Sequence, residues 1–196
     1  MFKFIYFIVF LSIISCHSSG NENKSNSEEV ENSINENLES NSGKPFFRFD
    51  AVDYYNYNID ENTAMNLLDY RKTALDSIKY NLILDETSED ISNEYFIMNL
   101  TKAGFKKKEI ESEDFQKLSN LFSEHPVREG LDFACIPIFR DILVFKKNEK
   151  VIGVAKICFG CNDYKIIGND ANTSNFGQGK DYEILSLILN RYIDKN

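Results

Sequence analysis

The sequence predicts an α+β fold: a small, mainly antiparallel sheet with a central long hairpin, packed by about four to five helices. Residues 135–145 and 151–159 are two nearly continuous apolar runs, separated by a short polar segment. Such runs are typical of strands buried on both faces, so we expect the hairpin in the middle of the sheet. Segments with helical apolar spacing lie between an N-terminal strand and the hairpin, and another follows it. This order favours α+β over alternating βα units.

The first fifteen residues predict a signal peptide. Lys3 supplies its positive charge, and residues 4–14 form an apolar stretch too short to span a bilayer as a helix. Residues 13–16, Ile-Ile-Ser-Cys, resemble the lipobox of bacterial lipoproteins. The resemblance implies cleavage before Cys16, a diacylglycerol on the Cys16 thiol and acylation of the new amino group. The alternatives are an ordinary signal peptide and a short membrane helix.

The lipobox resemblance also implies a membrane-anchored protein outside the cytoplasm. No Asp follows Cys16, which in such lipoproteins favours the bacterial outer membrane, on its periplasmic face or at the cell surface. Residues 16–44 are rich in Ser, Asn and Glu and predict a disordered tether behind the lipidated Cys16. Residues 45–196 are expected to form a single α+β domain. The net charge of −9 argues against nucleic acid as a partner.

The domain begins with a predicted strand at residues 46–59. Aromatic and aliphatic side chains alternate along it, and the intervening positions carry polar residues that include Asn56 and Asn58. This alternation predicts one buried and one solvent-exposed face.

Apolar residues at helical spacing predict five helices. In the third of them, Ile91, Tyr95 and Met98 mark the expected buried face, and Gly104 follows the last turn. The three lysines at residues 106–108 after it could bind an anionic ligand, but we interpret them as a solvated connector. The five helices are expected at residues 61–70 with Asp60 as N-cap, 74–83, 88–103, 112–124 and 181–193.

The hairpin turn is predicted at Asn148 and Glu149. With that turn, Asp141 lies opposite Lys156 on the neighbouring strand. Their charges would then be paired rather than stranded in the core.

Residues 162–167, beyond the hairpin, predict more strand. Residues 168–180 have no periodicity and predict a turn-rich loop. The last helix is expected to be capped by Asp181 and, because its apolar residues cover more than one face, to lie in the core.

Three cysteines of the domain, Cys135, Cys158 and Cys161, predict a structural disulfide or buried thiols. Cys158 and Cys161 could close a tight ring, or Cys135 could bridge to either of them, and strand register does not decide between these pairings. With His125 the three also make a Cys₃His set that zinc accepts. The Cys-x-x-Cys follows a strand, whereas a redox centre needs its first thiol at a helix N-terminus. Thiol-redox or zinc-dependent activity at Cys158 and Cys161 is the alternative hypothesis.

Two short motifs, Ile157–Cys161 and Phe176–Gln178, resemble those of uncharacterised bacterial lipoproteins. That resemblance supports the domain boundaries and implies no activity. The sequence contains no recognisable set of catalytic residues. It therefore favours a non-enzymatic binding or accessory module with no cofactor. Its expected partners are membrane lipid and an unknown protein or small ligand. Loops on a rigid scaffold often carry binding, so the candidate recognition residues are Asn169, Asp170, Asn172, Phe176 and Gln178.

Overall fold

The structure is a computed structural model that describes residues 43–84, 91, 94–126, 135–168 and 170–193. The predicted signal peptide, Cys16, nearly all of the predicted tether and Asn169 lie outside these ranges. Within the ranges, five strands form one antiparallel sheet with five α-helices around it, which confirms the α+β prediction. No helix in this part of the chain is long and apolar enough to cross a membrane. The elements are β1 (Ala51–Asn56), α2 (Glu61–Asp69), α3 (Ala74–Ile83), α4 (Glu94–Ala103), β2 (Lys106–Glu109), the 3-10 turn η1 (Ser112–Asp114), α5 (Phe115–Leu121), β3 (Asp141–Lys147), β4 (Lys150–Cys158), β5 (Asp163–Ile167) and α6 (Asp181–Leu189).

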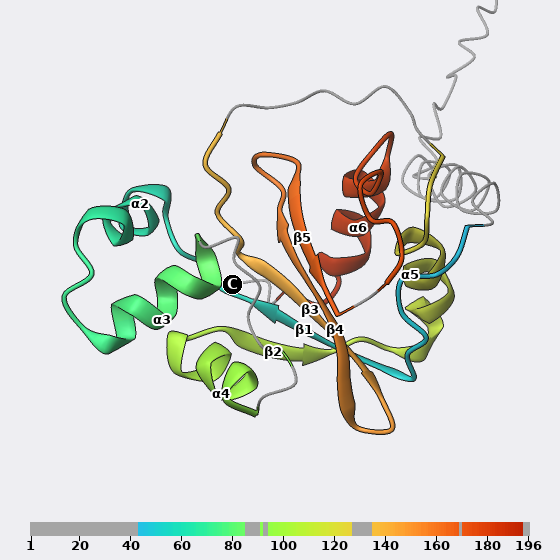
Figure 1. Cartoon of the computed structure of the whole chain (residues 1–196), viewed down its shortest axis with the longest axis horizontal. Helices are drawn as coiled ribbons and strands as arrows, with labels where there is room; N and C mark the ends of the chain where they lie inside the picture. Colours follow the sequence, from blue (N-terminus) through green and yellow to red (C-terminus); the bar gives the residue numbers. More distant parts are fainter. Residues whose placement is uncertain (1–42, 85–90, 92–93, 127–134, 169, 194–196) are drawn as a thin grey trace, which may run out of the picture.

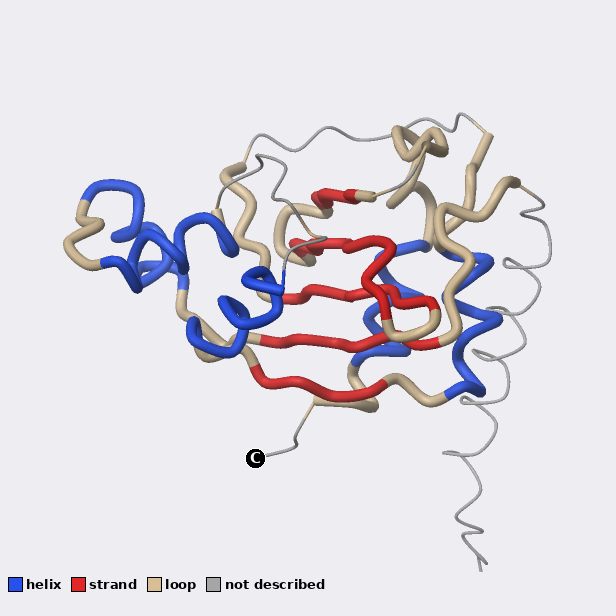
Figure 2. Tube along the Cα trace, turned by 60° about the horizontal axis from the view of Figure 1, so that its bottom comes forward, coloured by secondary structure: helices blue, strands red, loops and turns tan. Residues whose placement is uncertain are grey.

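The sheet has the strand order β2-β1-β3-β4-β5. The β3–β4 hairpin therefore lies inside the sheet, as its apolar sequence predicts. Helices α2, α3 and α4 pack on one face, here the α2–α4 face, and helices α5 and α6 pack on the other, the α5/α6 face (Figures 1 and 2). Each face has its own apolar core. The α2–α4 core includes Leu82, Phe96, Leu100, Ile142 and Val144, and the α5/α6 core includes Phe122, Leu143, Phe145, Ile184 and Leu185.

Strand β1 is shorter than predicted and has no solvent-exposed face. Val52 and Tyr54 are buried in the α5/α6 core, and Tyr55 is buried in the α2–α4 core. The expectation of one wet face is wrong, because helices cover both sides of this strand. Phe46 and Phe47 precede the strand, and their rings pack into the α5/α6 core.

Helices α2 and α3 begin where the sequence predicts. The Asp60 carboxylate accepts a hydrogen bond of 2.9 Å from the Thr63 backbone N–H, as expected of an N-cap. At α3, Thr73 and Asp76 form a capping box in which each side chain accepts from the other's backbone N–H. These bonds are local in sequence, which is why both helix starts could be predicted.

Helix α4 turns a different face toward the sheet from the one predicted. Tyr95 and Met98 are 57% and 38% exposed, whereas Phe96 and Leu100 are buried in the α2–α4 core. The helix has two apolar stripes, and packing against the sheet selects the second one. The end of the helix is as predicted, since Gly104 follows it with a φ of 98°.

Residues 106–109 form the edge strand β2, so the prediction of a solvated connector is wrong. The strand pairs antiparallel with β1. On the α2–α4 face, Lys107 Nζ lies 3.1 Å from Asp53 Oδ1, and Lys106 and Lys108 point to the opposite face because side chains alternate along a strand. Lysines suit an exposed sheet edge because their charge opposes pairing with a further strand.

The hairpin turn lies at Asn148 and Glu149, as predicted, and both residues have positive φ angles of 48° and 65°. The strands do not stay in simple register beyond it, because a bulge lies between Phe145 and Lys146. Close to the bulge, Gly153 lies against the Phe47 ring, which any larger residue at that position would meet. The bulge shifts the rest of the hairpin by one residue.

This shift overturns the predicted pair of Asp141 and Lys156. Asp141 lies opposite Ile157 instead, and a shift of one residue places the two charged side chains on opposite faces of the sheet. Lys156 points into the α2–α4 side, where its Nζ donates to the Asn81 carbonyl at 2.9 Å and lies 5.2 Å from the centre of the Phe139 ring. Asp141 faces the α5/α6 side.

Helix α6 lies in the core, as predicted, but Asp181 does not cap it. The Asp181 carboxylate accepts a hydrogen bond of 3.1 Å from Gly177 N–H, outside the helix, and the residue at the N-cap position makes no side-chain cap bond. Beyond the other end of α6, Arg191 pairs with the buried Asp114, and Tyr192 Oη donates to the same carboxylate at 2.7 Å. These contacts tie the residues after α6 to η1.

Candidate functional site

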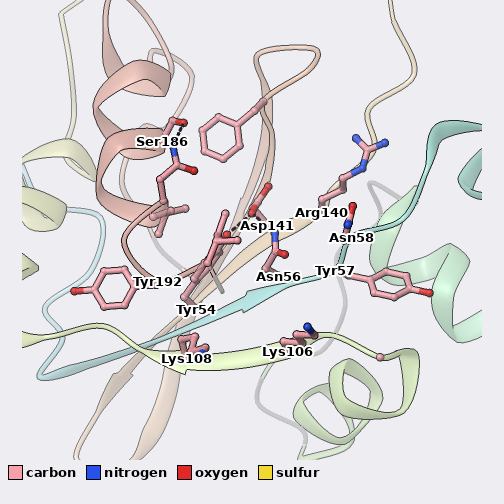
Figure 3. Close-up of a pocket in the computed structure, with 15 residues that line it drawn as sticks. Tyr54, Asn56, Tyr57, Asn58, Lys106, Lys108, Arg140, Asp141, Ser186 and Tyr192 are labelled. Carbon is pink, nitrogen blue, oxygen red and sulfur yellow. Dashed lines mark hydrogen bonds between the residues drawn. The ribbon is translucent and has the colours of Figure 1, made fainter. Parts of the chain in front are cut away.

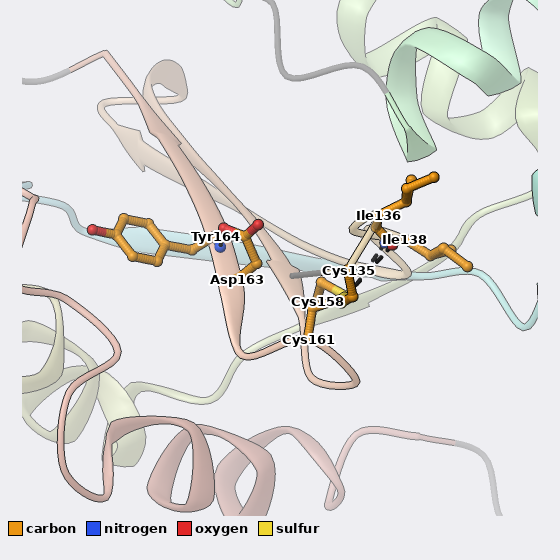
Figure 4. The surroundings of a disulfide bond; sticks show 7 residues. All are labelled: Cys135, Ile136, Ile138, Cys158, Cys161, Asp163 and Tyr164. Carbon is orange, nitrogen blue, oxygen red and sulfur yellow. Dashed lines mark hydrogen bonds between the residues drawn. A yellow bond between two sulfur atoms is a disulfide. The ribbon is translucent and has the colours of Figure 1, made fainter. Parts of the chain in front are cut away.

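The three cysteines lie together at the end of β4. Cys135 and Cys161 form a disulfide with their Cα atoms 6.1 Å apart (Figure 4). Cys158 is a buried free thiol whose Sγ accepts a hydrogen bond of 3.3 Å from Ile138 N–H. Among the pairings that the sequence left open, the bridge from Cys135 to Cys161 is the one present, and Cys158 and Cys161 do not close a ring.

His125 is buried beside the start of α6. Its Nε2 lies 3.0 Å from the Leu121 carbonyl oxygen and 3.7 Å from Asp181 Oδ2. In the part of the chain that the structure describes, no three His, Cys, Asp or Glu side chains are grouped to hold a metal ion. The predicted set of His125 and the three cysteines is therefore not brought together.

The predicted recognition loop is partly core. The Phe176 ring is buried and packs 4.9 Å, between ring centres, from both Phe122 and Tyr164, so it is not open to a partner. The polar groups bond within the loop region: Asn172 Oδ1 accepts from Ser174, and Gln178 Nε2 donates to Asn175. Asp170 is exposed.

A polar cleft lies on the α5/α6 face, between the sheet and the C-terminal end of α6. Its volume is about 460 Å³, within the range of small-molecule sites. Strand register places Lys106, Asn56 and Asp141 side by side on three adjacent strands along its floor. Figure 3 shows Asn56 and Asp141 near the centre, the lysines of β2 along one side and Ser186 of α6 across from them.

Asp141 is the central acceptor of this cleft. Its side chain is largely buried, with the residue 8% exposed. Tyr54 Oη donates to Asp141 Oδ1 at 2.5 Å and Asn56 Nδ2 donates to the same oxygen at 2.8 Å (Figure 3). Among the described residues, nothing donates a hydrogen bond to Asp141 Oδ2. One carboxylate oxygen is thus held in place, while the other is available to a ligand.

Burial also perturbs the ionisation of this group. Desolvation raises the pKa of Asp141 above the usual value of an aspartate, and the hydrogen bonds from Tyr54 and Asn56 and the charge of Arg140 offset only part of the effect. The pKa of Tyr54 is raised as well, by burial first and by the negative charge of Asp141 second. Tyr54 therefore remains a neutral donor to the carboxylate.

We expect Asp141→Asn to be more stable than the wild type at neutral pH. The amide oxygen can accept both existing hydrogen bonds, and no charge is buried. Because the folded-state pKa of Asp141 is raised, the folded protein holds its proton more tightly, so wild-type stability falls as pH rises from about 4 through that pKa. Urea unfolding at several pH values should show the advantage of the variant growing over this window and then levelling off. An advantage that is absent, or equal at all pH values, would contradict the expectation.

The residues that line the cleft include three cations, Lys106, Lys108 and Arg140. Arg140 Nε donates to the Ile59 carbonyl at 2.8 Å, which fixes the guanidinium and leaves its terminal nitrogens without an acceptor among the described residues. Lys106 is exposed and pairs with no described residue. In a chain with a net charge of −9, this lining is locally positive.

Sequence reasoning missed this site. The strongest signal for it in the sequence is the pair Arg140-Asp141 inside an otherwise apolar run, but the sequence favours an ion pair of Asp141 with Lys156. A second signal is the polar pair Asn56 and Asn58 at the end of the first strand, which the alternating pattern predicts to face solvent.

No protein-family model matches the chain, and neither a curated protein nor a solved structure matches it. The role of the cleft is therefore inferred from its chemistry.

Proposed function

We propose that the chain is a bacterial lipoprotein, anchored through Cys16 outside the cytoplasm at the outer membrane, whose domain binds a small polar ligand in the Asp141 cleft. The lipobox-like residues 13–16 and the polar, apolar-poor segment 16–44 support the anchor and tether. A domain on a tether can search the space near a membrane for a solute or partner.

The observation that carries the binding role is the state of Asp141. A buried carboxylate is costly unless its oxygens are satisfied. Here Tyr54 and Asn56 hold Oδ1, and Oδ2 points to a cleft large enough for a ligand. A ligand that donates to Oδ2 completes this arrangement.

The lining favours binding over catalysis. Nucleophilic catalysis needs a nucleophile activated by a neighbouring base. The lining residues of the cleft include no histidine or cysteine, and the single serine, Ser186, accepts a hydrogen bond of 3.3 Å from Asn190. The polar groups of the cleft are suited to orient a ligand.

A thermal-shift screen of the full chain in detergent, against small polar metabolites, tests the binding role. A ligand present at a hundred times its dissociation constant should stabilise the protein by about 2.7 kcal/mol. Asp141→Asn should lose this stabilisation, and Asp170→Asn in the 168–180 loop should keep it. The proposal is wrong if no solute stabilises the wild type, or if Asp141→Asn responds equally.

Cys16→Ser tests the anchor. We expect the wild type to fractionate with membranes and the variant to be released, because acyl chains supply the membrane affinity at about 0.8 kcal/mol per buried CH₂. Cell fractionation followed by detection of the protein measures this. Persistent membrane binding of the Cys16→Ser protein would rule out lipid anchoring at this residue.

A further inference from the structure

Side chains of both charges line the cleft. Asp141 Oδ2 is an open acceptor on its floor, and Lys106, two strands away on the same face of the sheet, is an open donor. Figure 3 shows Asp141 near the centre, with the β2 lysines on one side of it and Arg140 on another. The arrangement suits a ligand that carries both charges.

The spacing of these groups limits the size of that ligand. Lys106 and Asp141 lie opposite Asn56 on its two neighbouring strands, so their Cα atoms are about 10 Å apart. Their side chains stand off the same face of the sheet on either side of Asn56, so a ligand that reaches both charged groups lies across these three strands. A small molecule fits this spacing, whereas a folded partner does not.

We infer that the ligand is a small zwitterion of the amino-acid type, whose ammonium group binds Asp141 and whose carboxylate binds Lys106. This inference rests on the proposed binding function and names its ligand class.

An ammonium group is the best match for the open oxygen of Asp141. The two existing donors to this carboxylate, Tyr54 and Asn56, are neutral. A buried carboxylate gains most from a cationic donor, since charge-assisted hydrogen bonds are roughly twice as strong as neutral ones. The positive charge of Arg140 partly stabilises the Asp141 carboxylate, but Arg140 donates its Nε–H to the Ile59 carbonyl and not to Asp141. A ligand ammonium supplies the missing counter-charge.

Two other ligand classes fit less well. Carbohydrates stack on open aromatic faces, but the Tyr57 ring packs on Phe105 at 5.2 Å between ring centres. The Phe159 ring meets Tyr182 at 6.3 Å, and Arg191 lies 5.9 Å from the centre of the Tyr192 ring. The Tyr54 side chain is fully buried. A phosphate group would meet repulsion from Asp141 at the floor of the cleft.

The remaining wall of the cleft is apolar. Phe159, Leu189 and Ile193 line it on the side of α6, and Ile193 is exposed. An apolar amino-acid side chain can pack there while the two charged groups face the sheet.

Isothermal titration of the full chain in detergent with the twenty amino acids, taken singly, tests the inference. An amino acid that binds is then compared with its amine, which lacks the carboxylate, and with its acid, which lacks the ammonium. Each should bind at least roughly tenfold more weakly than the amino acid. Asp141→Asn should weaken binding of the amino acid and the amine, and Lys106→Met should weaken binding of the amino acid and the acid. Lys107→Met, on the opposite face of the same strand, is the control and should bind normally.

The outcomes separate the inference from the function on which it rests. If a neutral solute binds in an Asp141-dependent way and no amino acid does, the assignment of a zwitterionic ligand is wrong and the binding function stands. If the amine or the acid alone binds as tightly as the amino acid, the two-charge assignment is wrong. If no amino acid and no solute of the thermal-shift screen binds, both proposals fail.

Discussion

Replacing Phe145 with alanine is expected to lower the free energy of unfolding by about 3–5 kcal/mol. The Phe145 ring is fully buried at the centre of the α5/α6 core. Its ring centre lies 4.5 Å from that of Phe47, 5.0 Å from that of Phe122 and 5.2 Å from that of Phe49. Alanine would leave a cavity among rigid rings that cannot collapse into it. Urea denaturation of the wild type and variant measures the loss.

Tyr70→Ala is the matched control for this substitution. Tyr70 is also aromatic but is 63% exposed, so its removal should change stability by less than about 0.5 kcal/mol. A Phe145→Ala protein as stable as Tyr70→Ala would show that α5 and α6 do not cover this face of the sheet. The cleft lies between the sheet and α6, so its position would then be wrong as well.

Breaking the Cys135–Cys161 disulfide is expected to lower the free energy of unfolding by about 3.5 kcal/mol. The bridge joins residues 26 positions apart, and the figure follows from the loop-closure entropy that such a cross-link removes from the unfolded chain. Cys135→Ser with Cys161→Ser should match the reduced wild type in urea unfolding and should not respond to reductant.

Cys158→Ala separates the role of the bridge from that of the free thiol. Cys158 is buried and unbridged, so this variant should keep the full response to reductant. A Cys158→Ala protein that no longer responds would place Cys158 in the bridge and contradict the pairing. Thiol counting under denaturing conditions, with one free thiol expected in the described domain, gives an independent check.

Features that depend on neighbouring residues could be predicted from the sequence. The N-cap bond of Asp60 and the capping box of Thr73 and Asp76 span only a few residues, and the two helices begin where expected. The turn at Asn148 and Glu149 and the interior position of the hairpin were also predicted, because apolar runs and turn residues are local signals. The fold class follows from the order of these elements.

Features that depend on register could not be predicted. Gly153 is a local sign of the bulge between Phe145 and Lys146, but a glycine in a strand does not give the register, and the register decides whether Asp141 faces Lys156 or the cleft. For α4, the sequence offered two apolar stripes, and only contact with the sheet selects Phe96 over Tyr95.

The candidate site could not be predicted for the same reason. Asn56, Lys106 and Asp141 are separated by dozens of residues in sequence and meet only because β1 pairs with β2 on one side and β3 on the other. The contiguous, polar 168–180 loop has the sequence signs of a recognition loop, but Phe176 anchors it in the core.

The most direct test of the central claim, that Asp141 anchors a ligand in this cleft, is a pH titration of its carboxyl carbon by NMR. Asp141→Asn identifies the signal. We expect an apparent pKa of Asp141 above the ordinary value of about 3.9 in the free protein. When a binding amino acid is added, the pKa should return toward that value, since the ammonium stabilises the charged form. An ordinary pKa that does not respond to any amino acid would contradict the central claim.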